Sequence, residues 1–135
     1  MKIAIGSDHA AFEAKNEIID HLKNSGHEVI DKGTYDKSSC DYPDYAASVS
    51  KAVQAGDVQR GILICGTGIG MSIAANRFTN VRAALCYTVE LAELSRLHND
   101  ANVLCLGART QSVESMKSII QPWLTTEWEG DRHAQ

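Results

Sequence analysis

The sequence has little of what membrane proteins and nucleic-acid-binding proteins carry. It contains no apolar run long enough to cross a membrane, and the run at its N-terminus is too short for a signal peptide. Its 135 residues include 13 Lys and Arg against 17 Asp and Glu, and this formal net charge of −4 gives a nucleic-acid partner no electrostatic support. We therefore expect a cytoplasmic protein that binds neither membranes nor nucleic acids.

A second absence concerns paired cysteines. The four cysteines are widely and unevenly spaced and contain no C-x-x-C pair: Cys40, Cys65, Cys86 and Cys105. The spacing therefore suggests neither a metal site nor a redox pair, and in a reducing compartment all four should be free thiols. Three of them lie at or near the ends of apolar runs, where cysteine usually packs as a small hydrophobe.

What the sequence does contain is a regular alternation of short apolar runs and amphipathic segments. Strands are predicted at residues 2–7, 27–31, 62–64, 81–86 and 102–106. Helices are predicted at residues 10–25, about 41–55, just after the glycines at 66–70, 89–97 and 112–124. This alternation predicts one α/β domain over residues 1–135, with a parallel sheet and helices on both faces.

The first predicted helix has one apolar stripe, which we expect to form part of the core: Phe12, Ile18, Ile19 and Leu22. Charged residues on the other side are expected to face solvent: Glu13, Lys15, Glu17, Asp20 and Lys23. Gly26 ends the helix in the position that favours glycine.

The central feature is a strand that runs into a glycine-rich turn, Cys65-Gly66-Thr67-Gly68-Ile69-Gly70. In parallel α/β sheets, ligands bind beyond the carboxyl ends of the strands. Residues that follow three predicted strands should therefore meet at one edge: Asp8 and His9, residues 65–70, and Arg109. Tyr42 begins a helix and could lie at the same edge. His98 and Asn99 end a helix and should by default lie at the opposite edge, unless a second subunit supplies them or their loop folds back.

The turn does not match three common phosphate-binding loops. A dinucleotide fingerprint needs a third glycine where this chain has Met71, and no P-loop lysine follows the glycines. A phosphatase loop with a nucleophilic cysteine needs an arginine six residues after Cys65, which is again Met71. What remains is a ring of backbone N–H groups suited to a negatively charged oxygen, beside a thiol that could act as nucleophile or as base.

Six motifs together resemble a known family: G-S-D-H-A from Gly6, D-Y-P from Asp41, C-G-T-G-I-G from Cys65, S-R-L-H-N-D from Ser95, G-A-R from Gly107 and E-G-D-R-H from Glu129. Their order and spacing are similar to those of the ribose-5-phosphate isomerase B and galactose-6-phosphate isomerase family over essentially the whole chain. The resemblance implies a three-layer α/β/α sandwich with a Rossmann-like, five-stranded parallel sheet in the order 2-1-3-5-4. It also implies a homodimer or a dimer of dimers whose active sites are shared between subunits.

The same resemblance implies the reaction, which is the interconversion of an aldose phosphate and a ketose phosphate, typically ribose 5-phosphate and ribulose 5-phosphate. The family uses a cis-enediolate intermediate and needs no metal or other cofactor. By resemblance, Cys65 is the base, Thr67 supplies a hydroxyl and His98 is the acid that opens the sugar ring. The implied substrate-binding residues are Asp8, His9, Tyr42, Gly66, Gly68, Ile69, Gly70 and Asn99, with Arg109 and Arg132 as phosphate ligands.

Each of these residues also has a purely structural interpretation. Cys65 could be a packed thiol, Asp8 a helix cap and Thr67 a residue that only bonds its own turn. His98 could interact with a helix dipole, and the two arginines could be ordinary surface residues. Two other functions also stay open, namely a subunit of a galactose-6-phosphate or allose-6-phosphate isomerase and a non-catalytic module that binds a phosphate or nucleotide.

Overall fold

The sheet is parallel throughout its described part and has the expected strand order. The computed structural model describes residues 1–34 and 42–130. In this part five strands pair in the order β2-β1-β3-β5-β4: β1 (Lys2–Ser7), β2 (Glu28–Asp31), β3 (Arg60–Cys65), β4 (Ala83–Leu85) and β5 (Val103–Gly107). The predicted fold class and sheet order are therefore confirmed.

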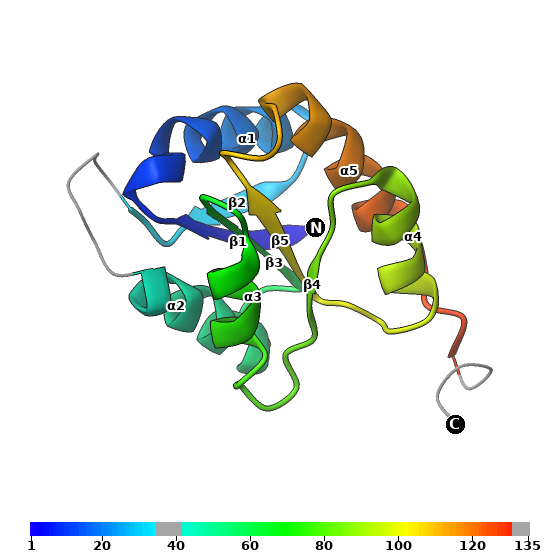
Figure 1. Ribbon diagram of the computed structural model, residues 1–135. Coiled ribbons are helices and arrows are strands. Elements are labelled where there is room, and N and C mark those ends of the chain that lie inside the picture. Colours follow the sequence, from blue (N-terminus) through cyan, green and yellow to red (C-terminus); the bar gives the residue numbers. More distant parts are fainter. Residues whose placement is uncertain (35–41, 131–135) are drawn as a thin grey trace.

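The helices form a layer on each face of this sheet (Figure 1). They are α1 (Phe12–Asn24), α2 (Tyr42–Gln54), α3 (Ile69–Ala75), α4 (Val89–Leu97) and α5 (Val113–Thr125). One cluster of buried side chains joins the sheet to α1 and α5, and α4 packs against α5. A second cluster joins the opposite face to α2 and α3. Within the described residues, no helix has the length and apolar character needed to span a membrane.

The alternation of side chains along β3 determines toward which face of the sheet the Cys65 side chain points. Ile62 and Ile64 belong to the cluster beneath α1 and α5. Leu63 and Cys65 belong to the cluster beneath α2 and α3, because successive strand residues point to opposite faces. The Cys65 side chain therefore points toward the layer that contains α3, the helix that follows the glycine turn.

Three predicted elements differ from the observed ones by two residues at one end. The third strand, predicted over residues 62–64, spans Arg60–Cys65. The first helix was predicted from residue 10, but a 3₁₀ turn over His9–Ala11 precedes α1. The Asp8 carboxylate accepts a hydrogen bond from the Ala11 amide at 3.1 Å and starts this turn. The fourth strand was predicted over residues 81–86 but spans only Ala83–Leu85. It starts late because the Val81 amide bonds the Phe78 carbonyl in a turn.

The expectation that Lys15 faces solvent was wrong. Its side chain is 0% exposed, and its Nζ atom lies 2.8 Å and 2.7 Å from the two carboxylate oxygens of Asp31 at the end of β2. Asp31 also accepts a hydrogen bond from the Gly33 amide at 2.8 Å. The helical pattern could not show this ion pair, because the partner charge comes from a strand 16 residues away.

Asp31→Asn is expected to destabilise the fold, because it removes a negative charge that pairs with the buried Lys15 ammonium. Breaking a fully buried pair costs about 3–5 kcal/mol, and because the Asp31 side chain is 35% exposed we expect about 2 kcal/mol. Urea denaturation measures the change in the free energy of unfolding. Asp20→Asn, at an exposed position of α1, is the control and should change it by less than about 0.5 kcal/mol. Equal losses in both variants would contradict this account of the pair.

Candidate active site

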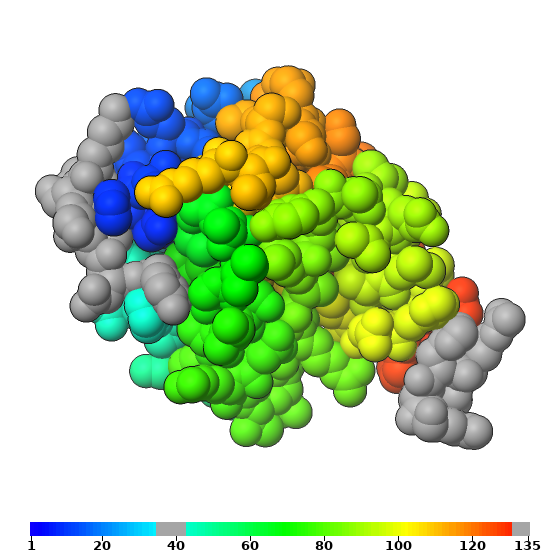
Figure 2. All heavy atoms as spheres, viewed as in Figure 1, coloured from blue at the N-terminus to red at the C-terminus, as the bar shows by residue number. Residues whose placement is uncertain are grey.

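The ends of three neighbouring strands meet at one edge of the sheet. The Asp8 amide donates to the Ile64 carbonyl at 3.2 Å, which ties the segment after β1 to the end of β3. The amides of Ala108 and Arg109 donate to the carbonyls of Cys65 and Gly66, both at 2.8 Å. Figure 2 shows the segment after β5 (yellow to orange) lying between the segment after β1 (blue) and the region of α3 (green). This edge therefore gathers the residues that the strand-end rule predicted.

The Cys65 sulfur lies under the glycine turn and is nearly covered. The residue is 5% exposed, with half-buried Gly66 and exposed Thr67 following it. Its Sγ accepts a hydrogen bond from the Gly68 amide at 3.1 Å. This contact needs glycine at position 68, where φ is +85° and a Cβ atom would lie 2.5 Å from Leu85 Cδ1. The turn thus aims an N–H donor at the sulfur.

The other described cysteines behave as packing residues. Burial raises the pKa of the Cys105 thiol, and the neighbouring thiols of Cys65 and Cys86 add to this effect. Burial likewise raises the pKa of Cys86, although a hydrogen bond with Ser95 opposes it. These two thiols therefore stay protonated at neutral pH and are confirmed as core residues. Cys40 lies outside the described residues.

The turn uses part of its own hydrogen-bonding capacity. The Ile69 amide donates to Thr67 Oγ1 at 3.2 Å, so Thr67 does bond its own turn, as its structural interpretation required. Its hydroxyl hydrogen can still be donated to a ligand. Gly70 lies in the first turn of α3, where an amide has no carbonyl acceptor within the helix. The Gly70 amide and the Thr67 hydroxyl are thus two donors that the turn can offer to a ligand.

Asp8 and His9 follow β1 at the same edge. Asp8 caps the 3₁₀ turn through Oδ1, which confirms its structural interpretation, and its second carboxylate oxygen can accept from a ligand. His9 Nδ1 is buried and has no hydrogen-bond partner among the described residues. Because an unpaired buried nitrogen is costly, a polar ligand that bonded His9 Nδ1 would remove this cost.

Arg109 brings a positive charge to the turn. Its side chain is exposed and lies over Gly66, where a Cβ atom would be 3.3 Å from Arg109 Cδ and 3.4 Å from Nε. The absence of a side chain at Gly66 therefore leaves room for this arginine. A guanidinium in this place can bind an anionic oxygen through several N–H groups.

His98 and Asn99 lie at the opposite edge of the sheet. The His98 amide donates to the Leu94 carbonyl at the end of α4, and the Asn99 carbonyl accepts from Arg82 Nη1 at 3.0 Å. Arg82 directly precedes β4, so this contact marks the amino ends of the strands. Within one chain the fold does not bring His98 or Asn99 to Cys65, in agreement with the default expectation for residues that end a helix.

Sequence reasoning missed the residue that fixes the His98 turn. Arg96 is 5% exposed, and its Nη1 donates to Asp100 Oδ1 at 2.8 Å and to the Ala101 carbonyl at 2.7 Å. Its Nε donates to the Thr126 carbonyl at 3.1 Å. The i, i+4 spacing of Arg96 and Asp100 was the signal available in the sequence. This network holds His98 and Asn99 in a defined turn.

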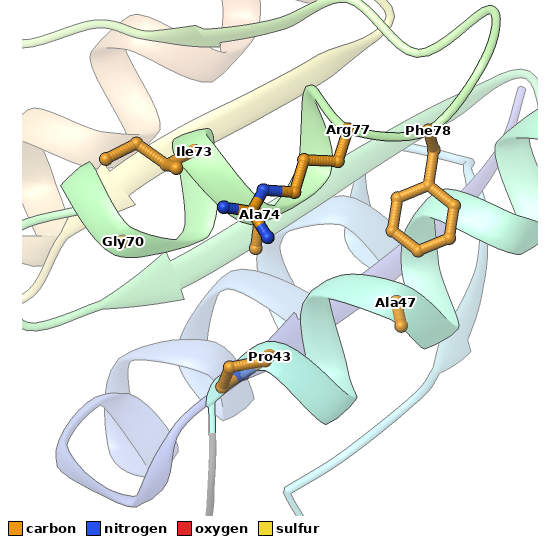
Figure 3. Close-up of a pocket in the computed structure, with 7 residues that line it drawn as sticks. All are labelled: Pro43, Ala47, Gly70, Ile73, Ala74, Arg77 and Phe78. Carbon is orange, nitrogen blue, oxygen red and sulfur yellow. The ribbon is translucent and has the colours of Figure 1, made fainter.

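A cavity of about 370 Å³ lies between α2 and α3 (Figure 3) and is lined by Pro43, Ala47, Gly70, Ile73, Ala74, Arg77 and Phe78. It shares Gly70 with the turn, so it adjoins the candidate site. Tyr42 is the first residue of α2, and Pro43 follows it at the cavity wall.

Arg132 lies outside the described residues, so its predicted role stays a prediction. Within residues 1–34 and 42–130, no three His, Cys, Asp or Glu side chains gather closely enough to share a metal ion.

Comparison with known proteins decides the family. A family model described as Ribose/Galactose Isomerase matches residues 3–135. This chain belongs to the ribose/galactose isomerase family. It is 52% identical over 134 residues to ribose-5-phosphate isomerase B of Escherichia coli (strain K12), a match that covers 99% of this chain and 90% of the relative.

Structural similarity agrees with this membership of the ribose/galactose isomerase family. The solved structure of ribose-5-phosphate isomerase B from Clostridium thermocellum matches with a TM-score of 0.98 and 51% identity, over 99% of this chain and 90% of that one. Not all relatives carry the same sugar in their names. D-erythrulose-4-phosphate isomerase of Pectobacterium atrosepticum is 46% identical over 132 residues, which cover 96% of this chain and 86% of that protein. Membership therefore identifies the chain as an isomerase, while the sugar has to be argued separately.

Proposed function

We propose that this member of the ribose/galactose isomerase family interconverts ribose 5-phosphate and ribulose 5-phosphate, without a metal, through an enediolate. The observation that carries the proposal is the Cys65 sulfur at the carboxyl end of β3, 3.1 Å from the Gly68 amide. An N–H donor favours the ionised form of a thiol, and a thiolate can remove a proton from carbon. The identity of 52% to a ribose-5-phosphate isomerase B supports the choice of sugar.

In the proposed reaction, the Cys65 thiolate takes the proton from C2 of the open-chain aldose. The electron pair of the broken C–H bond forms the C1–C2 double bond, and the aldehyde oxygen takes up the negative charge. The Gly70 amide and the Thr67 hydroxyl are the proposed donors to that oxygen. The Cys65 thiol then returns a proton to C1, while the O2 hydroxyl loses its proton and becomes the ketone, and O1 is protonated.

The phosphate group requires positive charge and N–H donors at a fixed distance from the reacting carbons. We propose His9 and Arg109 as its ligands, together with the Arg132 that the family resemblance implies. His9 Nδ1, which has no partner in residues 1–34 and 42–130, and the position of Arg109 over Gly66 support this assignment. Asp8, at the same edge, is the proposed acceptor for a sugar hydroxyl.

Ring opening is assigned to His98, with Asn99 as a further substrate ligand, and we propose that both come from a second subunit of a homodimer. Their position at the opposite edge supports this, because only another copy could bring them to Cys65 without refolding the turn that Arg96 holds. Exposed apolar side chains on α3 and α4 offer a surface for such a contact: Ile69 is 50%, Ile73 59% and Leu91 49% exposed. A two-fold axis would give two equivalent sites.

Purified protein is expected to form ketose from ribose 5-phosphate with a higher kcat/KM than from allose 6-phosphate or galactose 6-phosphate. Rates on all three sugars separate the proposed function from the alternative of a six-carbon isomerase subunit. Activity should survive dialysis against EDTA, because no step uses a metal. Binding of all three sugars without any ketose would instead support the non-catalytic phosphate-binding module.

A further inference from the structure

Tyr87, just beyond β4, touches the back of the glycine turn. Its hydroxyl donates to the Thr67 carbonyl at 2.5 Å. That carbonyl and the Gly68 N–H belong to the same peptide unit, and the Gly68 N–H donates to Cys65 Sγ at 3.1 Å. One hydrogen-bonded path therefore runs from the tyrosine hydroxyl, across a single peptide, to the sulfur.

The peptide between Thr67 and Gly68 is also confined sterically. A Cβ atom on Gly107 would lie 2.6 Å from the Thr67 carbonyl oxygen and 2.7 Å from its carbon, so β5 packs directly against this peptide. Close packing restricts where the carbonyl can go, but a peptide plane can still rotate about its flanking bonds. The hydrogen bond from Tyr87 is the contact that favours one orientation of the plane.

Tyr87 itself is held in place by its neighbours in the chain. The Cys86 amide donates to the Cys105 carbonyl at 3.3 Å, and the Cys86 carbonyl accepts from Gln111 Nε2 at 3.3 Å. On the other side, Thr88 caps α4 by accepting from the Leu91 amide at 3.1 Å. Tyr87 is 39% exposed, so its fixed position comes from these anchors more than from burial.

We infer that Tyr87 is a positioning residue for the reaction: its hydroxyl orients and polarises the Thr67–Gly68 peptide so that the Gly68 amide stabilises the Cys65 thiolate. A hydrogen bond to a carbonyl strengthens the N–H donor of the same amide, because such bonds polarise one another. Tyr87 need not contact the substrate. Its role in turnover rests on the proposed function, whereas its effect on the sulfur does not.

The test is Tyr87→Phe, which removes the hydroxyl and keeps the ring. Alkylation of Cys65 by iodoacetamide at pH 7, followed by peptide mass spectrometry, measures the reactive thiolate. We expect the alkylation rate to fall roughly three- to tenfold, the range that one hydrogen bond supports. The kcat for ribose 5-phosphate should fall by a similar factor, with KM changed by less than about twofold. Tyr45→Phe, which removes a hydroxyl from α2, is the matched control and should leave both rates unchanged.

The sign of the alkylation change separates this role from a merely structural one. Cys65 is only 5% exposed, so loosening of the turn would expose its sulfur further and raise the alkylation rate. A raised or unchanged rate in Tyr87→Phe would therefore overturn the inference. Tyr87→Leu, which also lacks the hydroxyl, should repeat the fall if the first variant does not fold. If the wild type forms no ketose, the proposed function fails, but the alkylation comparison still decides the role of Tyr87.

Discussion

Cys65→Ala is expected to lower the kcat for ribose 5-phosphate by about 10²- to 10⁴-fold, the contribution of a positioned acid or base. Binding of the sugar phosphate, measured by calorimetry, should weaken by less than about threefold, because the proposed phosphate ligands do not include the sulfur. Alanine removes a group that is 5% exposed and accepts one hydrogen bond, so the glycine turn should keep its shape. A large loss of turnover with retained binding is the behaviour of a base.

Cys86→Ala is the matched control for this prediction. It removes another buried thiol, one that belongs to the core cluster beneath α1 and α5. Its activity per folded molecule should stay close to that of the wild type, although its stability should fall. Comparable losses of turnover in the two variants would indicate that Cys65 acts through packing, and would contradict its role as the base.

A mixture of Cys65→Ala and His98→Asn chains is expected to recover activity that neither variant has alone. In a symmetric dimer with shared sites, a mixed pair has one site with both defects and one site with none. Random reassociation after unfolding and refolding should therefore restore about a quarter of the wild-type sites. The position of His98 at the edge opposite to Cys65 is the physical basis of this expectation.

The control for the mixing experiment is a mixture of Cys65→Ala with Cys65→Ser chains. Both defects then affect the same half of every site, so no pairing restores an intact one. Mass spectrometry under native conditions shows whether mixed pairs have formed. Mixed pairs without recovered activity would contradict the shared site, and full activity of His98→Asn by itself would contradict the ring-opening role.

The site residues whose position could be predicted from the sequence are those that directly follow a strand. The rule that ligands bind beyond the carboxyl ends of parallel strands brought Asp8, residues 65–70 and Arg109 together, and the hydrogen bonds between these segments confirm it. The same reasoning placed His98 and Asn99 at the other edge. These predictions succeeded because topology alone decides which edge a strand-end residue occupies.

What the sequence did not predict depends on contacts between distant segments. Lys15 was expected in solvent because its partner, Asp31, belongs to another element. Tyr87 was not singled out, because its hydroxyl reaches a carbonyl 20 residues earlier in the chain. The side chains of Thr67 and Asp8 accept hydrogen bonds from amides of their own turns. A sequence motif does not show which donors and acceptors of a side chain are already used by such local hydrogen bonds. Hydrophobic periodicity predicts on which face of a helix or strand a residue lies, but not which group its side chain contacts there.

The most direct test of the whole account is the fate of deuterium placed at C2 of ribose 5-phosphate. If Cys65 is the base, its sulfur should remove this deuterium from C2, and the deuterium should exchange with water. Wild-type protein should release the label as ketose accumulates, and Cys65→Ala should keep it in bound but unreacted sugar. Label that stays on C2 with the wild type, or that leaves equally fast without the sulfur, would contradict the account.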